Sequence, residues 1–194
     1  MSLTLLEPAR HELEVKRSRF IALAERCADE QSARRFLASV ADPSATHNCW
    51  AWKSGQSYRF DDDGEPGGTA GRPILAAIEN QGYDQVAVVV IRYYGGIKLG
   101  TGGLARAYGG SAAECLRTAR SEPLIPTVRK RIQLPFEAVS LAHQLLDRHA
   151  AVKCGERYTS QGLELEIECP RSSLAALERD LRDASSGNVQ IRSA

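Results

Sequence analysis

Residues 88–104 read VVVIRYYGGIKLGTGGL, a β-branched run followed by a glycine-rich loop and the start of a helical pattern. The run extends over residues 85–92 and is apolar on both faces, which predicts a central strand covered on both sides. From Leu104 to about Arg120, apolar side chains recur every three or four positions, which predicts a long amphipathic helix. A buried strand joined to a helix in this way indicates a mixed fold of helices and sheet.

The residues before this stretch predict the rest of an N-terminal domain. Asp29 is suited to cap a helix over residues 30–40, and Pro73 is suited to the first turn of another helix that ends near residue 81. Residues 61–71, DDDGEPGGTAG, contain too much glycine and proline for a regular element. Four further strands are expected, at residues 12–15, 20–27, 47–53 and 58–61.

Pro123 and Pro126 bracket a short linker, which predicts two domains, residues 1–124 and residues 128–194. The pattern of the second domain follows the order βαββαβ, which is that of a ferredoxin-like split fold. Its strands are expected at residues 128–134, 151–158, 163–169 and 189–192, and its helices at residues 139–149 and 174–181. The core of so small a domain is marginal, so docking to the first domain would stabilise it.

The third strand of the second domain has two different faces. Its apolar positions alternate with Glu164, Glu166 and Glu168. The neighbouring first strand places Arg129 and Arg131 on the same side as these glutamates, so cross-strand Arg–Glu pairs are expected. This face lacks the exposed aromatic residues that stack bases in RNA-recognition sheets, and we interpret it as a solvated face.

The composition excludes several classes of protein. The formal net charge is +1, so nucleic-acid binding would need a local patch of cations. The longest aliphatic run spans residues 86–91, far short of the roughly 20 residues of a membrane-spanning helix. No secretory signal is expected from residues 1–10. The five cysteines have irregular spacings, which are typical of thiols in a cytosolic protein.

The glycine-rich loop is the strongest candidate for a ligand site. Glycines let backbone N–H groups approach a ligand closely, and the helix that follows presents unsatisfied N–H donors at the positive end of its dipole. The spacing fits neither a Walker loop nor a dinucleotide-binding fingerprint. An anion or phosphate site is therefore one interpretation, and a tight turn that needs glycine for packing is the other. The candidate ligand residues are Arg92, Gly95, Gly96, Lys98, Gly100, Thr101, Gly102, Gly103 and Arg106.

A second candidate loop has four carboxylates within residues 61–65. They could hold a hard cation, but their spacing does not fit the calcium-loop template, so no metal is predicted. Capping of backbone N–H groups and pairing with arginine is the preferred interpretation. His47 and Cys49 share one face of a strand and could form a nucleophilic dyad, but a packed or hydrogen-bonded pair is preferred. The residues assigned to this second loop site are His47, Asp62, Asp63, Glu65 and Thr69.

Four sequence blocks carry a resemblance to a known family. They are KRSRF at residues 16–20, HNC at residues 47–49, DDGEP with GTAGRP within residues 62–73, and RYYGG with LGTGGL within residues 92–104. Together they resemble the signature blocks of the IMPACT family, in its bacterial YigZ branch. The resemblance covers nearly the whole chain, and the two glycine-rich blocks are its most specific part.

The resemblance implies an α+β protein of two domains. The first would be a βαβ domain of the ribosomal-protein type that also forms domain four of elongation factor G. The second would be a ferredoxin-like βαββαβ domain, similar to domain five of that factor. Eukaryotic relatives regulate translation initiation through a kinase activator, but they use an additional N-terminal domain that this chain is expected to lack. The resemblance implies no catalytic residues.

Three functions remain open at this point. We favour a non-enzymatic, translation-linked protein of the cytoplasm that contacts RNA, the ribosome or a phosphate-bearing ligand through its first domain. The first alternative is an enzyme that acts on a phosphorylated small molecule at the glycine-rich loop, by analogy with small-molecule kinases of the same broad fold. The second is a protein-interaction regulator. No cofactor and no membrane contact are predicted, and the oligomeric state is left open.

Overall fold

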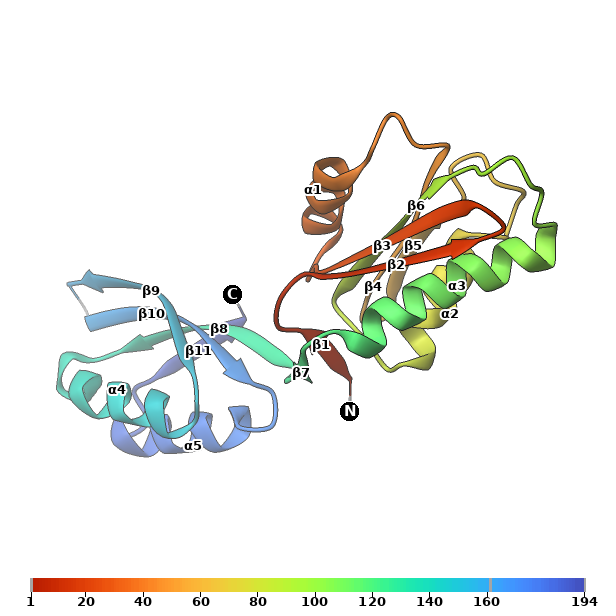
Figure 1. Cartoon of the computed structure of the whole chain (residues 1–194). Coiled ribbons are helices and arrows are strands. Elements are labelled where there is room, and N and C mark those ends of the chain that lie inside the picture. Colours follow the sequence, from red (N-terminus) through yellow and green to blue (C-terminus); the bar gives the residue numbers. More distant parts are fainter. Residues whose placement is uncertain (1, 161, 194) are drawn as a thin grey trace. The chain divides into compact units, whose positions relative to one another are not determined.

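The computed structural model describes residues 2–160 and 162–193, and the chain is a mixed α/β protein (Figure 1). It divides into two compact units, residues 1–124 and residues 125–194. Each unit has its own sheet and its own hydrophobic core. Among the described residues, no helix is both long and apolar enough to cross a membrane.

The N-terminal unit is built on a five-stranded antiparallel sheet. Its strands, in spatial order, are β2 (Ala9–Val15), β3 (Ser18–Arg26), β6 (Val86–Tyr93), β4 (His47–Ser54) and β5 (Ser57–Asp61). Strand β6 lies in the middle, and residues 86–91 are buried on both faces of the sheet. The prediction of a central, fully covered strand is therefore confirmed.

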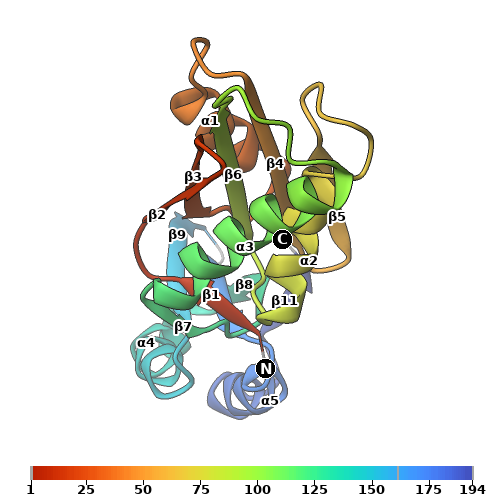
Figure 2. The same ribbon diagram turned by 45° about the vertical axis from the view of Figure 1, so that its right-hand side comes forward.

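Helices cover both faces of this sheet (Figure 1, Figure 2). Helices α2 (Gly71–Asn80) and α3 (Thr101–Thr118) lie side by side on one face, where their apolar residues pack against side chains such as Val88 and Cys49. Helix α1 (Glu30–Val40) covers the other face and packs against Trp52 and Val89. Asp29 caps α1 as predicted, because its carboxylate accepts a hydrogen bond from the Ser32 amide at 2.7 Å.

Helix α3 begins three residues earlier than expected, at Thr101 rather than Leu104. Gly100 precedes it with a φ of +76°, a conformation that favours glycine, and its carbonyl accepts the first helical bond, from the Leu104 amide. Gly102 and Gly103 are therefore part of the first helical turn. Their weak intrinsic helix propensity, about 1 kcal/mol below that of alanine, is the reason that the sequence pattern suggested a loop.

The predicted linker is partly ordered into a strand. Strand β7 (Ser121–Pro123) pairs with β1 (Leu3–Leu5), so the first and last strands of the N-terminal unit form a small two-stranded antiparallel sheet. The pairing joins segments more than a hundred residues apart, so local patterns could not indicate it. Only residues 124–126 remain between β7 and the first strand of the next unit.

The second unit has a four-stranded antiparallel sheet with two helices on one face. Its strands are β8 (Thr127–Leu134), β9 (Val152–Thr159), β10 (Gly162–Pro170) and β11 (Gln190–Ser193), and their spatial order is β11-β8-β10-β9. A short 3-10 helix, η1 (Phe136–Ala138), leads into α4 (Val139–Arg148), and α5 (Leu174–Ala184) lies beside α4. The element order matches the expected βαββαβ pattern, apart from the short η1.

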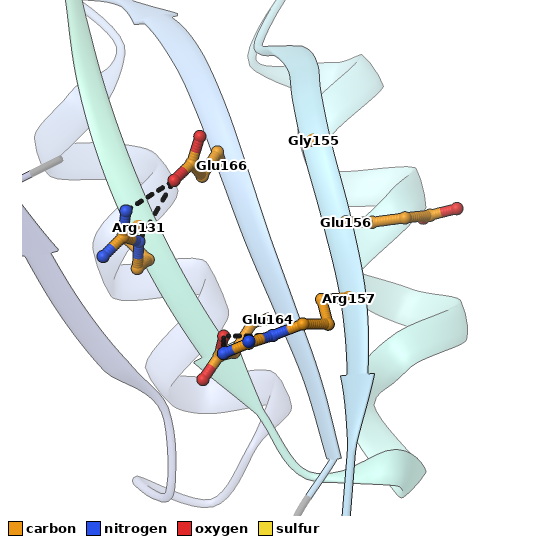
Figure 3. A pocket seen from close by; sticks show the side chains of 6 residues that line it. All are labelled: Arg131, Gly155, Glu156, Arg157, Glu164 and Glu166. Carbon is orange, nitrogen blue, oxygen red and sulfur yellow. Dashed lines mark hydrogen bonds and ion pairs between the residues drawn. The ribbon is translucent and has the colours of Figure 1, made fainter.

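The open face of this second sheet carries the expected Arg–Glu pairs. Arg131 pairs with Glu166 across β8 and β10 at 2.6 Å, and Arg129 pairs with Glu168 at 3.2 Å. Figure 3 shows the first of these together with a pair that the sequence did not indicate, between Arg157 on β9 and Glu164. The arginines of these pairs are exposed and the glutamates are partly exposed, so the pairs lie on a solvated surface and contribute little to stability.

Candidate functional site

A buried ion pair joins the two loops that the sequence singled out. Arg92, near the end of β6, places Nη1 2.5 Å from Oε1 of Glu65 in the acidic loop. Both side chains are almost completely buried, and the hydroxyl of Tyr108 on α3 donates to the same Glu65 oxygen at 2.7 Å. The charge of Arg92 is therefore compensated inside the protein. Arg92 was a candidate anion ligand, and the structure places it in the structural role that the arginine-pairing interpretation predicts.

Asp62 holds the acidic loop in the shape that presents Glu65. Its carboxylate accepts hydrogen bonds from the amides of Gly68, Ala70 and Gly71, at 2.7 to 2.9 Å. Partial burial raises the pKa of Asp62, but these three donors outweigh it and hold the pKa below its usual range. The capping interpretation is confirmed for this carboxylate.

The neighbouring residues of the acidic loop are satisfied locally as well. Asp63 accepts from the Asn48 amide through Oδ2 at 2.5 Å, and the Thr69 hydroxyl donates to the Pro66 carbonyl at 2.6 Å. Within residues 2–160 and 162–193, no cluster of His, Cys, Asp and Glu side chains is arranged to hold a metal ion.

His47 and Cys49 bond to the acidic loop rather than to each other. His47 Nδ1 lies 2.7 Å from the Asp63 carbonyl oxygen, and its Nε2 is 3.8 Å from Oε1 of Glu65. The Cys49 thiol donates to the Asp62 carbonyl at 3.0 Å, and burial raises the pKa of this thiol to about 12. Cys49 therefore holds its proton at neutral pH, and the geometry does not support a nucleophilic dyad.

The glycine-rich loop is held against the turn between β2 and β3. A Cβ atom at Gly95 would lie 2.0 Å from the Arg17 carbonyl oxygen, so only glycine fits there. The Gly95 amide donates to the Ser18 hydroxyl at 3.1 Å, and the same hydroxyl accepts from Arg92 at 3.4 Å. The packing interpretation therefore applies to Gly95. Gly96 and Gly100, in contrast, have open space around the Cβ position.

Four cations lie around the start of α3, and we call Lys16, Arg17, Lys98 and Arg106 the basic rim. All four are exposed, and in the described part of the chain their side chains have no hydrogen-bond or ion-pair partner. Lys16 and Arg106 line one pocket of about 210 Å³ whose other walls are apolar side chains and Gly103. Thr101 is exposed at the first position of α3, two residues before Gly103, which lines this pocket.

Sequence reasoning missed part of this arrangement. Lys16 and Arg17 were recognised in a motif block but not as neighbours of the glycine-rich loop. Ser18 and Tyr108, which fix Arg92 and Glu65, were not assigned to either loop site. A signal for Tyr108 was present, because a tyrosine on the apolar face of a helix needs a buried partner for its hydroxyl.

Fold and site together define the class of this protein: a mixed α/β protein of two units, whose first unit locks a glycine-rich loop to an acidic loop through a buried ion pair. The family model described as the Impact N-terminal domain matches residues 16–116. Within this class, the chain therefore belongs to the IMPACT family, which is generally linked to translation regulation.

Several relatives support this assignment. An IMPACT family member of Thermus thermophilus is 48% identical over 156 residues, which are 80% of this chain and 86% of the relative. The IMPACT family member YigZ of Escherichia coli is 36% identical over 185 residues, with 92% and 90% covered. A crystal structure of a hypothetical protein superposes with a TM-score of 0.78 at 33% identity, covering 100% of this chain and 97% of the other.

Proposed function

We propose that this protein is a translation-linked binding protein of the cytoplasm that contacts RNA, free or in the ribosome, through the basic rim. The observation that carries the proposal is the set of four exposed cations around the N-terminus of an 18-residue helix, which have no ion-pair partner among the described residues. An arginine or lysine without a carboxylate partner is available to a phosphate, and the helix end adds N–H donors.

The overall charge balance makes this local surface the relevant one. A net charge of +1 gives the chain no general attraction for nucleic acid, so a phosphate backbone must be held where cations gather without acids. Of the carboxylates in the acidic loop, Glu65 is compensated by the buried Arg92, whereas Asp62 accepts hydrogen bonds from backbone amides and keeps its charge. The four cations of the rim outnumber the exposed Glu14 beside Lys16, so the rim has a net positive charge.

We also propose finer fold assignments in support of this function. The N-terminal unit would be of the ribosomal-protein type that also forms domain four of elongation factor G. The strand order β11-β8-β10-β9 supports a ferredoxin-like assignment for the second unit, and we infer that the two units are separate domains. An RNA-contacting fold in the first unit agrees with the location of the rim.

An enzyme of small phosphorylated molecules is less well supported. The pocket at the rim has about 210 Å³, below the roughly 300–1,000 Å³ of most small-molecule sites. The thiol of Cys49, which lies near the acidic loop, is protonated at neutral pH. These observations favour a surface that binds an extended polyanion.

Lys98→Glu tests the proposal. We expect at least a tenfold loss of affinity, about 1.4 kcal/mol, for an oligouridylate dodecamer measured by fluorescence anisotropy, with little change in melting temperature. The affinity of the native chain should fall steeply with salt, because bound phosphates release counterions. Lys130→Glu, which reverses a cation of the second unit, is the control and should bind normally. Normal binding by Lys98→Glu would favour the protein-interaction alternative.

A phosphorylated metabolite would give a different pattern. It would raise the melting temperature in a saturable manner at moderate salt, as expected for a ligand that binds only the folded state. Such a result, together with salt-insensitive or absent RNA binding, would support the enzyme alternative instead.

A further inference from the structure

We propose that Tyr94 is a stacking platform for one base of a single-stranded RNA whose phosphates lie on the basic rim; this inference rests on the proposed function. Tyr94 follows β6 directly, and 46% of its surface is exposed. Its amide donates to the Thr46 hydroxyl at 2.9 Å, which fixes the backbone that carries the ring. A large aromatic side chain is thus held at the surface beside the glycine-rich loop.

The side of the ring that faces the protein is already occupied. The guanidinium carbon of Arg92 lies 5.4 Å from the centroid of the Tyr94 ring and 5.5 Å from that of Phe20. Arg92 is only 5% exposed and is fixed by Glu65 and Ser18. A rigid, buried cation therefore supports the inner face of the ring, and the exposed area belongs to the outer face and the edges.

The surroundings of Tyr94 suit a nucleotide chain. The next residue, Gly95, packs on the carbonyl of Arg17, so the ring lies next to the turn that carries two cations of the rim. Gly95 and Gly96 have no side chains that could cover the outer face, and Ile97 is 41% exposed. A base on the ring would leave its phosphates within the field of the rim.

This arrangement selects the class of RNA. Bases of a single strand can turn outward and stack on an aromatic side chain, which strengthens binding at each stacked base. In a duplex the faces of the bases are stacked inside, and the protein reaches phosphates, 2′-hydroxyls and base edges only. The ring should therefore raise the affinity for single strands alone, while the rim acts on both.

Tyr58 provides a matched control. It is also a tyrosine with 46% of its surface exposed, but it lies on β5 at the edge of the sheet, with the side chain of Lys53 opposite. Residues of the rim do not neighbour it in the sheet register. If any exposed tyrosine contributes to RNA binding, wherever it lies on the surface, Tyr58→Leu and Tyr94→Leu will lower the affinity for RNA equally.

The experiment measures the affinity of the full chain for two probes, an oligouridylate dodecamer and the same strand paired with oligoadenylate. Tyr94→Leu should weaken binding of the single strand roughly fivefold to a hundredfold and leave duplex binding unchanged. Tyr94→Phe and Tyr94→Trp, which keep a ring, should retain the affinity for the single strand. Tyr58→Leu should bind both probes as the native chain does.

The outcomes separate this inference from the proposed function. If Tyr94→Phe loses as much affinity as Tyr94→Leu, or if Tyr94→Leu weakens both probes equally, the stacking role is wrong while a loss in Lys98→Glu would still support the rim. If the native chain binds neither probe, both proposals fail. The aromatic variants keep the test decisive even if the leucine variant folds poorly. Retained or tighter single-strand binding by Tyr94→Trp would support the platform, and tenfold weaker binding would contradict it.

Discussion

Two arginine–glutamate pairs of this protein have nearly equal lengths and opposite surroundings. In the N-terminal unit, Arg92 lies 2.5 Å from Glu65, and the side chains are 6% and 4% exposed. In the second unit, Arg131 lies 2.6 Å from Glu166, and the side chains are 55% and 49% exposed. The distance between the charged atoms does not distinguish the two pairs, but access to water does.

The difference determines what each pair can do. Burial removes the hydration of both charges, so each partner depends on the other, and removal of one leaves an uncompensated charge inside the protein. At the exposed pair, water and salt replace a lost partner at little cost. The buried pair therefore holds two loops together, whereas the exposed pair lies on the open face of a sheet and stabilises it little.

The largest expected effect comes from Glu65→Gln. The amide keeps the shape and can still accept hydrogen bonds, but it leaves the Arg92 guanidinium buried without a counter-charge. We expect the free energy of unfolding of the N-terminal unit to fall by about 3–5 kcal/mol. Urea unfolding followed by tryptophan fluorescence measures this, because both tryptophans of the chain, Trp50 and Trp52, lie in β4 of that unit.

A combined variant tests the reason for this loss. Glu65→Leu with Arg92→Met and Tyr108→Phe removes the charges and the dependent hydroxyl together, and it should recover most of the stability, since apolar side chains can replace a buried ion pair. A combined variant that is as unstable as Glu65→Gln would show that shape, not charge, is responsible.

A smaller effect is expected for Asp62→Asn, and it should depend on pH. The folded-state pKa of Asp62 lies below its unfolded value near 3.8, so its contribution is present above that pH and is lost as the pH falls through the folded pKa. We expect the variant to be about 1–2 kcal/mol less stable at neutral pH, with the gap to the native chain closing in acid. Urea midpoints across this range measure it; a gap independent of pH would contradict the assignment.

The smallest effect is expected for Glu166→Gln, the same substitution as in the buried pair. Neither the thermal midpoint of the second unit nor the affinity for RNA should change measurably, because the exposed Arg131 can be solvated. Far-UV circular dichroism follows the unfolding, since the second unit has no tryptophan. A loss as large as that of Glu65→Gln would remove the distinction between the two pairs.

Much of the fold could be predicted from the sequence, because its signals are local. The β-branched run at residues 86–91 indicates a buried strand, Asp29 caps α1, and the alternation of glutamates along β10 gives the open face. The expected start of α3 is too late because intrinsic propensity disfavours Gly102 and Gly103 in a helix, whereas the structure includes both in its first turn. The pairing of β1 with β7 has no local signal at all.

The candidate site was predictable only as a list of residues. Three carboxylates, Asp62, Asp63 and Glu65, were possible partners of Arg92, and the choice depends on the loop shape that the Asp62 hydrogen bonds impose. Likewise, the contact between Gly95 and the Arg17 carbonyl arises only once β3 and β6 pair in register. Spatial neighbours of this kind follow from the sheet and not from spacing along the chain.

The turn between β2 and β3 has a consequence for how this protein can change. Both of its central residues, Lys16 and Arg17, adopt positive φ angles, of 48° and 64°, which favour asparagine and glycine in two-residue hairpin turns. Replacing them with Asn-Gly would relieve backbone strain and stabilise the hairpin, but it would remove two of the four cations of the basic rim. Under the proposed function, selection for thermal stability and selection for RNA affinity therefore act in opposite directions on the same two positions. A thermophilic variant of this chain could keep the cations only by gaining its extra stability elsewhere.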